Sequence, residues 1–356
     1  MIKIVQLLGF GLGGVIIAYI CNLLLLSFSK SLGIRNKNDI VVRWSNESKP
    51  SLGGVSFFIV FLFSSIAYSI LFFDENIFHN IQFVGLMLGG SIAFTMGLAD
   101  DAYNTRPIMK LIIQILCGLI LVFTKTTIDL THHFYVDAIL TVFWVIILMN
   151  SLNMLDNMDG ITGTVVLFIL LTCVITNWIL LDFNANIWSI ILIAMIGGVI
   201  GFLKLNIHPS KLFMGDAGSQ FIAFFVAFFS IQSLWNVNQF TITQIPSWVG
   251  FVLCLVVLTP AAVDTLTVVI NRLKKGQSPM VGGKDHTTHH LVYAGKNDLQ
   301  VWYIFLGISL LSLILGLTIV LMVKANYLAL IPLFILFFVI TFLLLYKNTI
   351  KYKPKQ

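Results

Sequence analysis

Long apolar runs separated by short polar segments dominate the chain. A helix rises about 1.5 Å per residue, so apolar runs of roughly 16–25 residues can cross a hydrocarbon core of about 30 Å. Backbone groups in lipid must be hydrogen-bonded within their own segment, and the runs lack the alternating polarity of barrel strands. The pattern therefore predicts an all-α polytopic integral membrane protein with about eleven transmembrane helices. We place these helices at 4–28, 52–73, 81–99, 107–124, 134–149, 161–181, 186–203, 217–235, 247–270, 300–323 and 327–346.

The composition agrees with this pattern. Hydrophobic residues make up 58% of the 356 residues and charged residues only 10%, whereas soluble domains carry roughly 25% charged residues. A chain this apolar cannot bury its hydrophobic surface in one water-soluble core, so a soluble protein is excluded. We expect a single transmembrane domain over 1–356.

The Lys and Arg residues indicate the orientation in the membrane. Of the 21 basic residues, only Lys3, Lys125 and Lys324 fall on one side of the predicted spans, and the other 18 fall on the opposite side. By the positive-inside rule, the basic side is cytoplasmic, which places the N-terminus outside and the C-terminus inside. The net charge of +6 is then a topology signal, and we expect no nucleic-acid partner. The predicted cytoplasmic loops lie near 29–51, 100–106, 150–160, 204–216 and 271–299.

Carboxylates gather at the cytoplasmic ends of the predicted spans. Ionisable groups at membrane depth are costly, so such a cluster is a functional-site hypothesis by default. One apolar run ends directly in Asp100 and Asp101, with Asn104 three residues later. Adjacent carboxylates repel unless a cation lies nearby, and hard oxygen ligands suit Mg²⁺. Helix capping is the structural alternative. The informative acids are Asp100, Asp101, Asp156, Asp159, Asp216, Asp264 and Asp285.

Two further polar segments follow apolar runs. Asn153, Asp156 and Asp159 are spaced three apart, so they share a face if the segment is helical. They offer donors and acceptors to a base, a ribose or a sugar; the spacing does not fit an EF-hand loop, and a plain Asn/Asp turn is the alternative.

The segment 206–219 leads into the next span. The backbone N–H groups at Asp216 and just after it can face an anion at the start of that helix. Lys211 can meet a phosphate as a point charge. Phe213 can stack on a base or anchor the loop at the membrane interface.

Three histidines fall within five positions of the long polar segment 271–299. The spacing of His286 and His290 suits zinc if the segment is helical. Because the other clusters offer oxygen ligands, we favour contact with a phosphate or proton transfer by His286, His289 and His290 over zinc. Asp264 lies four residues after Pro260 inside a span, and it either faces the site or pairs with a basic neighbour.

The polar sequence blocks described above, taken in their order along the chain, resemble those of the polyprenyl-phosphate N-acetylhexosamine-1-phosphate transferases, of glycosyltransferase family 4 type. The resemblance spans most of the chain. The spaced histidines are similar to the undecaprenyl-phosphate N-acetylglucosamine-1-phosphate transferase branch, because the muramoyl-pentapeptide branch has three adjacent His. The blocks that carry it are 49–54, Asp100-Asp101-x-x-Asn104, Asn153-x-x-Asp156-x-x-Asp159-Gly160, Phe213-Met214-Gly215-Asp216-x-Gly218-Ser219, and 285–290.

The resemblance implies a role for each matching residue. Asp100 is the implied base for, or orienter of, the lipid phosphate, and Asp101 and Asp216 are the implied magnesium ligands. The implied catalytic residues are Asp100, Asp101, His286, His289 and His290. The implied substrate-binding residues are Lys49, Asn104, Asn153, Asp156, Asp159, Lys211 and Phe213.

The resemblance also implies a reaction. A UDP-N-acetylhexosamine would give its sugar 1-phosphate to a polyprenyl phosphate with Mg²⁺ or Mn²⁺, releasing UMP in the first membrane step of cell-envelope glycan synthesis. The implied location is the lipid bilayer of a bacterial inner membrane, with the site on the cytoplasmic face; a homodimer is left open. A phospho-N-acetylmuramoyl-pentapeptide transferase and a secondary transporter are the alternatives. The polar clusters lie at one face instead of the midplane, which disfavours transport.

Overall fold

The computed structural model describes residues 4–31, 49–72, 76–181, 186–240, 245–279 and 282–353. Helices connected by short segments account for the architecture, and these ranges contain no strand. The all-α prediction is therefore confirmed over the described chain. Most of the predicted loop near 29–51 lies outside the described residues, over 32–48, as does Lys3.

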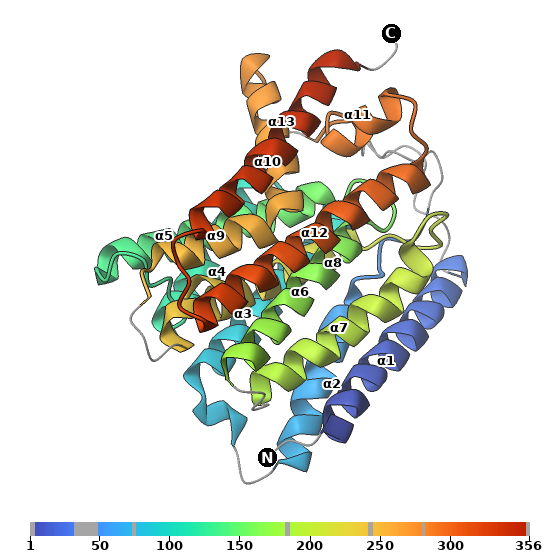
Figure 1. The fold of residues 1–356 in the computed structure, drawn as a ribbon. Coiled ribbons are helices and arrows are strands. Elements are labelled where there is room, and N and C mark those ends of the chain that lie inside the picture. The colour runs from blue at the N-terminus through green and yellow to red at the C-terminus, as the bar shows by residue number, and fades with distance from the viewer. Residues whose placement is uncertain are drawn as a thin grey trace.

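Thirteen α-helices are described (Figure 1). They are α1 (Ile4–Ser31), α2 (Val55–Leu71), α3 (Ile81–Tyr103), α4 (Pro107–Phe123), α5 (Phe134–Leu155), α6 (Ile161–Leu180), α7 (Ile187–Asn206), α8 (Gly215–Ser230), α9 (Trp248–Val257), α10 (Thr259–Lys274), α11 (Thr287–Tyr293), α12 (Asp298–Lys324) and α13 (Ile335–Lys351). Short segments are η1 (Ile77–His79), η2 (Ile231–Trp235, a π turn that extends α8), η3 (Val237–Phe240) and η4 (Ile331–Phe334).

The helices account for the apolar runs of the sequence. Within the described chain, 8 helices are long and apolar enough to cross a membrane, or up to 9 if α9 and α10 form one broken span. α2 and α4 are apolar but shorter, at 17 residues each. The chain is thus a polytopic membrane protein.

The predicted span 247–270 is not one helix. It divides into α9 and α10, which are bent by 81° relative to each other. Pro260 lies in the first turn of α10, where its missing N–H is not needed. The break turns α10 toward the end of the bundle where α11 lies (Figure 1).

Helix α8 forms the centre of the bundle. It packs against α2, α3, α5 and α6, and its phenylalanines are fully buried. Phe225 contacts Phe221 and Phe229 along the helix. This rigid central helix fixes the position of its first residues, which include Asp216.

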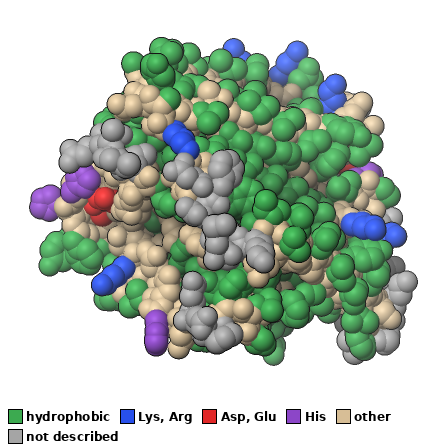
Figure 2. All heavy atoms as spheres, turned by 60° about the horizontal axis from the view of Figure 1, so that its bottom comes forward, with side chains coloured by type: hydrophobic (Ala, Val, Ile, Leu, Met, Phe, Trp, Pro, Cys, Tyr) green, Lys and Arg blue, Asp and Glu red, His purple; other side chains and the backbone are tan. Residues whose placement is uncertain are grey.

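The surface suits a lipid environment. On α1, exposed apolar side chains recur every four residues, at Leu8, Leu12, Ile16 and Ile20, so one face of the helix is lipid-facing in character. Figure 2 shows a face rich in hydrophobic side chains, with scattered Lys and Arg side chains that lie mostly near its margin. Helix α1 begins at the lower end of the bundle and α13 ends at the upper end (Figure 1).

Candidate active site

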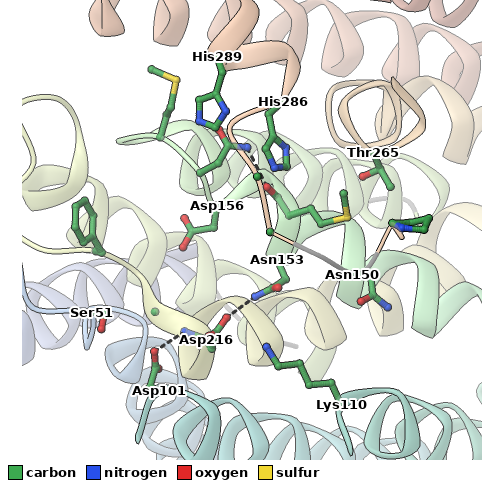
Figure 3. Close-up of a pocket in the computed structure, with 18 of the residues that line it drawn as sticks. Ser51, Asp101, Lys110, Asn150, Asn153, Asp156, Asp216, Thr265, His286 and His289 are labelled. Atoms are coloured by element: carbon green, nitrogen blue, oxygen red, sulfur yellow. Dashed lines mark hydrogen bonds between the residues drawn. The ribbon is translucent and has the colours of Figure 1, made fainter. Parts of the chain in front are cut away.

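A cavity of about 990 Å³ opens at the end of the bundle where α3 and α5 finish and α8 begins. Side chains from α3, α4, α5, α8, α10 and α11 line it (Figure 3). The lining includes five carboxylates, although they come from distant parts of the sequence. These are Asp101, Asp156, Asp159, Asp216 and Asp298.

Asp101 and Asp216 are adjacent. The Asp101 carboxylate accepts the backbone N–H of Asp216 at 3.1 Å and that of Ala217 at 2.9 Å. The sequence predicted that N–H groups at the start of α8 face an anion; this anion is the carboxylate of Asp101.

Glycines allow this close approach. A Cβ atom on Gly97 of α3 would lie 2.2 Å from the carbonyl oxygen of Asp216. The backbone of 50–54 also pairs with the segment before α8: Phe213 N–H donates to Pro50, and Gly53 N–H donates back to Phe213. Two sequence blocks about 160 positions apart therefore lie side by side and hold the start of α8.

Asp100, next to Asp101, makes contacts with α4 and with the segment before it. It is buried, pairs with Lys110 of α4, and accepts the N–H and the hydroxyl of Thr105 at 2.8 and 2.6 Å. Lys110 lines the cavity, whereas Asp100 is not among the lining residues. Asn104 also lies off the cavity, where it ends α3 in the left-handed conformation (φ 50°).

Asn153 and Asp156 come from the end of α5. The Asn153 amide donates to Asp216 at 2.7 Å and to Ser219 at 2.8 Å, which fixes the Asp216 side chain (Figure 3). Enclosure by protein, together with the negative charge of Asp216, raises the pKa of Asp156 to about 7. Excess negative charge is therefore concentrated here.

Asp159 connects the site to the loop after α7. It accepts the backbone N–H and the hydroxyl of Ser210 at 3.1 and 2.8 Å. Lys49 approaches the same hydroxyl at 3.4 Å and lies 5.6 Å from the ring centre of Phe213. Lys49, Asp159 and Phe213 line the cavity, but Lys211 does not.

The three histidines separate in the structure. His286 and His289 are buried and line the cavity, with ring centres 5.4 Å apart. His290 is not part of the lining; its Nδ1 contacts the backbone carbonyl of Tyr352 just after α13. The structure thus does not bring His290 to the other predicted residues.

Several cavity residues were not singled out from the sequence as site residues. Lys110 and Arg272 were counted only as topology signals, and Gln114 and Thr265 were read as parts of spans. Arg272 forms a two-point ion pair with Asp285, at 2.7 and 2.8 Å, which holds the segment before α11. The signal that could have found Lys110 is its place one turn inside an apolar run, where a charge needs a partner.

The donor chemistry fits a magnesium ion. The carboxyl groups of Asp100 and Asp216 lie within hydrogen-bonding reach of each other, and Asp101 adjoins both. Within the described chain, no set of three or more Asp, Glu, His or Cys side chains forms a complete metal cage. Mg²⁺ is usually held by one or two carboxylates plus substrate phosphates, and Asp101 and Asp216 are two adjacent carboxylates in the cavity lining.

Comparisons with known proteins show what the chain is similar to. A model of "Glycosyl transferase family 4" matches residues 83–234, which include Asp101, Lys110, Asn153 and Asp216. A Bacillus subtilis protein named as a probable undecaprenyl-phosphate N-acetylglucosaminyl 1-phosphate transferase is 27% identical over 268 residues, covering 72% of this chain and 70% of the relative.

Two other relatives represent different named activities. The decaprenyl-phosphate N-acetylglucosaminephosphotransferase of Mycolicibacterium smegmatis is 23% identical over 287 residues, covering 73% of this chain and 70% of the relative. A phospho-N-acetylmuramoyl-pentapeptide-transferase of Thermoanaerobacter sp. is 27% identical over 291 residues, covering 75% of this chain and 83% of the relative. All three names describe transfer of a phosphorylated sugar.

Proposed function

Because residues 83–234 match the model of glycosyl transferase family 4, we propose that the chain transfers N-acetylglucosamine 1-phosphate from UDP-N-acetylglucosamine to undecaprenyl phosphate. An oxygen of the lipid phosphate attacks the β-phosphorus of the nucleotide-sugar. The bond between the β-phosphorus and the bridging oxygen breaks, and UMP leaves with that oxygen. The products are undecaprenyl-diphospho-N-acetylglucosamine and UMP.

One observation carries this proposal: carboxylates from α3, α5 and α8 converge with Lys110 in a cavity at one end of a membrane bundle. Both substrates are anionic phosphates, which repel each other at short range. When bound, Mg²⁺ would neutralise part of the negative charge of the two phosphates and stabilise the charge on the transferred phosphoryl group. Mn²⁺ would supply the same chemistry. Asp101 and Asp216 would hold the metal ion, and Asn153 keeps Asp216 oriented.

The remaining polar residues would bind the donor. Phe213 lies in the cavity wall beside Lys49, where it offers a flat face to the uracil base. Asp156 and Asn157 offer acceptors and donors to hydroxyl groups. His286 and His289 lie on the side of the cavity across from Asp101 and Lys110 (Figure 3).

An apolar groove supports a lipid acceptor. It has a volume of about 500 Å³, lies between α4 and α5, and is lined only by apolar side chains. Leu111 and Ile146 line both this groove and the cavity, so the two adjoin. A polyprenyl chain in the groove would place its phosphate at the cavity beside Lys110 and Gln114.

We also propose eleven spans, counting α2, α4 and the bent pair, with the N-terminus outside and the C-terminus inside. In this orientation, which the positive-inside rule supports, the cavity would lie on the cytoplasmic face of a bacterial inner membrane. There a cytosolic nucleotide-sugar and a membrane-held lipid phosphate can meet, in the first membrane step of cell-envelope glycan synthesis.

The test is to identify the lipid product. Purified protein is incubated with undecaprenyl phosphate, Mg²⁺ and, separately, UDP-N-acetylglucosamine, UDP-N-acetylgalactosamine or UDP-N-acetylmuramoyl-pentapeptide, and lipids are read by mass spectrometry. We expect a diphospho-N-acetylglucosamine lipid. A product from the pentapeptide donor alone would favour the muramoyl branch, and no lipid product from any donor would contradict the transferase.

A further inference from the structure

A buried carboxylate stands behind His286. Asp264 lies on α10, one turn after the break at Pro260, and is completely inaccessible. Its Oδ2 atom lies 2.8 Å from Nδ1 of His286. Its Oδ1 atom accepts the backbone N–H of Thr287 at 2.8 Å and the Thr287 hydroxyl at 2.6 Å. One carboxylate thus holds both the imidazole ring and the start of α11.

The arrangement determines which edge of the ring faces the cavity. Asp264 does not itself line the cavity, whereas His286, which it contacts, does. Since Nδ1 is directed at Asp264, the opposite edge of the ring, which carries Nε2, is left for the substrate. The contacts that fix the start of α11 come from the other oxygen of the same carboxylate, so Asp264 holds the ring and the helix start together.

We propose that Asp264 is a positioning residue for the transfer reaction, which holds His286 with a proton on Nδ1 and with Nε2 presented to the diphosphate. This inference rests on the proposed function. A carboxylate can only accept a proton from Nδ1, so Asp264 selects the tautomer of the neutral ring that carries its proton on Nδ1. When Nε2 also carries a proton, Nε2–H can donate to a phosphate oxygen.

The variant Asp264→Asn separates positioning from packing. The asparagine Oδ1 can still accept both groups of Thr287, so the start of α11 is kept. Its amide nitrogen then faces Nδ1 of His286 as a donor, which forces the opposite tautomer. A similar change in a carboxylate–histidine pair of serine proteases lowers kcat by about 10⁴ with the geometry intact.

The chain offers a matched control. Asp137, on α5 at the other end of the bundle, is also buried and accepts the backbone N–H and hydroxyl of Thr131 at 3.0 and 2.9 Å. Its environment resembles that of Asp264, but it does not line the cavity, and its carboxylate has no hydrogen bond or ion pair with a histidine among the described residues; only its backbone N–H donates to the carbonyl of His133. We expect Asp137→Asn to keep the wild-type kcat within about threefold.

Kinetics give the first test. We expect Asp264→Asn to lower kcat by about 100-fold or more, with the KM for UDP-N-acetylglucosamine within about threefold, and Asp264→Glu to recover part of the loss. In a His286→Gln background, Asp264→Asn should lower kcat by less than about threefold further. Additive losses in the double variant, or a wild-type kcat for Asp264→Asn, would overturn the inference.

A second measurement needs no turnover. Nitrogen NMR of [¹⁵N]histidine-labelled protein, with His286 assigned by its loss in His286→Gln, reports which ring nitrogen carries the proton. We expect Nδ1 to be protonated in the wild type and to lose the proton in Asp264→Asn. An unprotonated Nδ1 in the wild type would overturn the inference even if the protein transfers no sugar phosphate; a protonated Nδ1 in an inactive protein would count against the proposed function alone.

Discussion

Gln114 stands where the polar cavity approaches the apolar groove. It is buried on α4, one turn after Lys110, and its Oε1 accepts from Asn150 at 2.7 Å. Within the described residues, its Nε2 donor has no hydrogen-bond partner. A buried donor without a partner is rare and calls for a ligand, and the phosphate of the acceptor lipid would supply one.

We expect Gln114→Leu to raise the KM for undecaprenyl phosphate by roughly 10- to 100-fold, because a hydrogen bond to a charged group contributes about 1.5–3 kcal/mol. The KM for the nucleotide-sugar should stay within about twofold. Steady-state kinetics with each substrate varied would measure both. Gln232→Leu, on the π turn and away from the cavity, is the control; an unchanged acceptor KM in Gln114→Leu would remove this contact.

His289 gives a prediction about pH. Burial, together with the charge of His286, lowers the pKa of His289 to about 3, against the opposing effect of Asp264. An unfolded chain takes up this proton near pH 6.5, so the unfolded state binds a proton that the folded state does not. The folded state therefore loses stability as pH falls below 6.5, by about 2 kcal/mol between pH 6.5 and 5.

Thermal unfolding in detergent at pH 7 and pH 5 would measure this effect. We expect the wild type to lose more of its Tm between the two values than His289→Gln does. The exposed His79 provides the control, since His79→Gln should keep the wild-type pH dependence. Equal losses in wild type and His289→Gln would show that His289 is protonated in the fold.

For single residues, the sequence identified the polar side chains of the site but not the partners they contact. Asn153, Asp156 and Asp159 all line the cavity, but the helix on which their spacing would give a shared face ends at Leu155. Asp264 was left without a role, because its contact with His286 depends on how α10 is turned. The position of His290 against Tyr352 depends on the docking of α13, which no local pattern encodes.

The crossing of α2 and α8 controls the position of Asp216. A Cβ atom on Gly54, just before α2, would lie 2.1 Å from the Cα atom of Gly218 on α8. Backbone cannot yield as a flexible side chain can, so we expect Gly54→Ala to destabilise the protein by about 1–3 kcal/mol and to displace Asp216. Thermal unfolding and turnover should both fall.

Gly307→Ala is the matched change. Gly307 lies in α12 with nothing within 4 Å of the position of a Cβ atom. Alanine is favoured over glycine inside a helix by about 0.5–1 kcal/mol, so this variant should be as stable as the wild type or more so. If Gly54→Ala unfolds no earlier than Gly307→Ala, the close crossing is not needed.

The elements themselves were largely predictable. Spans of about 20 residues follow from the requirement that backbone groups be paired within lipid, and the predicted run 161–181 differs from α6 by a single residue. The 81° break between α9 and α10 was missed, because Pro260 marks a possible bend without fixing its angle. The pairing of 50–54 with Phe213 is a long-range contact that periodicity cannot indicate.

The orientation of the whole molecule is open to a direct test. Lys125 and Lys284 are exposed and lie in segments assigned to opposite sides of the membrane. In a variant whose four cysteines are replaced by alanine, we expect Lys125→Cys to react with an impermeant maleimide on intact cells. Lys284→Cys should react only after the membrane is opened. The reverse pattern would place the cavity on the outer face.

For the whole molecule, composition was enough to predict a helical membrane protein. It could not predict that α8 would be the central, nearly fully buried helix, since all spans are similarly apolar. The convergence of Asp101 and Asp216 depends on the close packing of α3 and α8 at Gly97, and it follows from three-dimensional packing alone.

The central claim is that Asp101 and Asp216 hold one divalent ion against a diphosphate. Release of UMP from UDP-N-acetylglucosamine and undecaprenyl phosphate tests it most directly, measured with Mg²⁺, with a chelator, and with Mn²⁺ added back. We expect release only with metal, and a loss of at least 100-fold, about 3 kcal/mol, in folded Asp216→Asn. Release that persists in the chelator, or near-normal turnover by Asp216→Asn, would contradict the account.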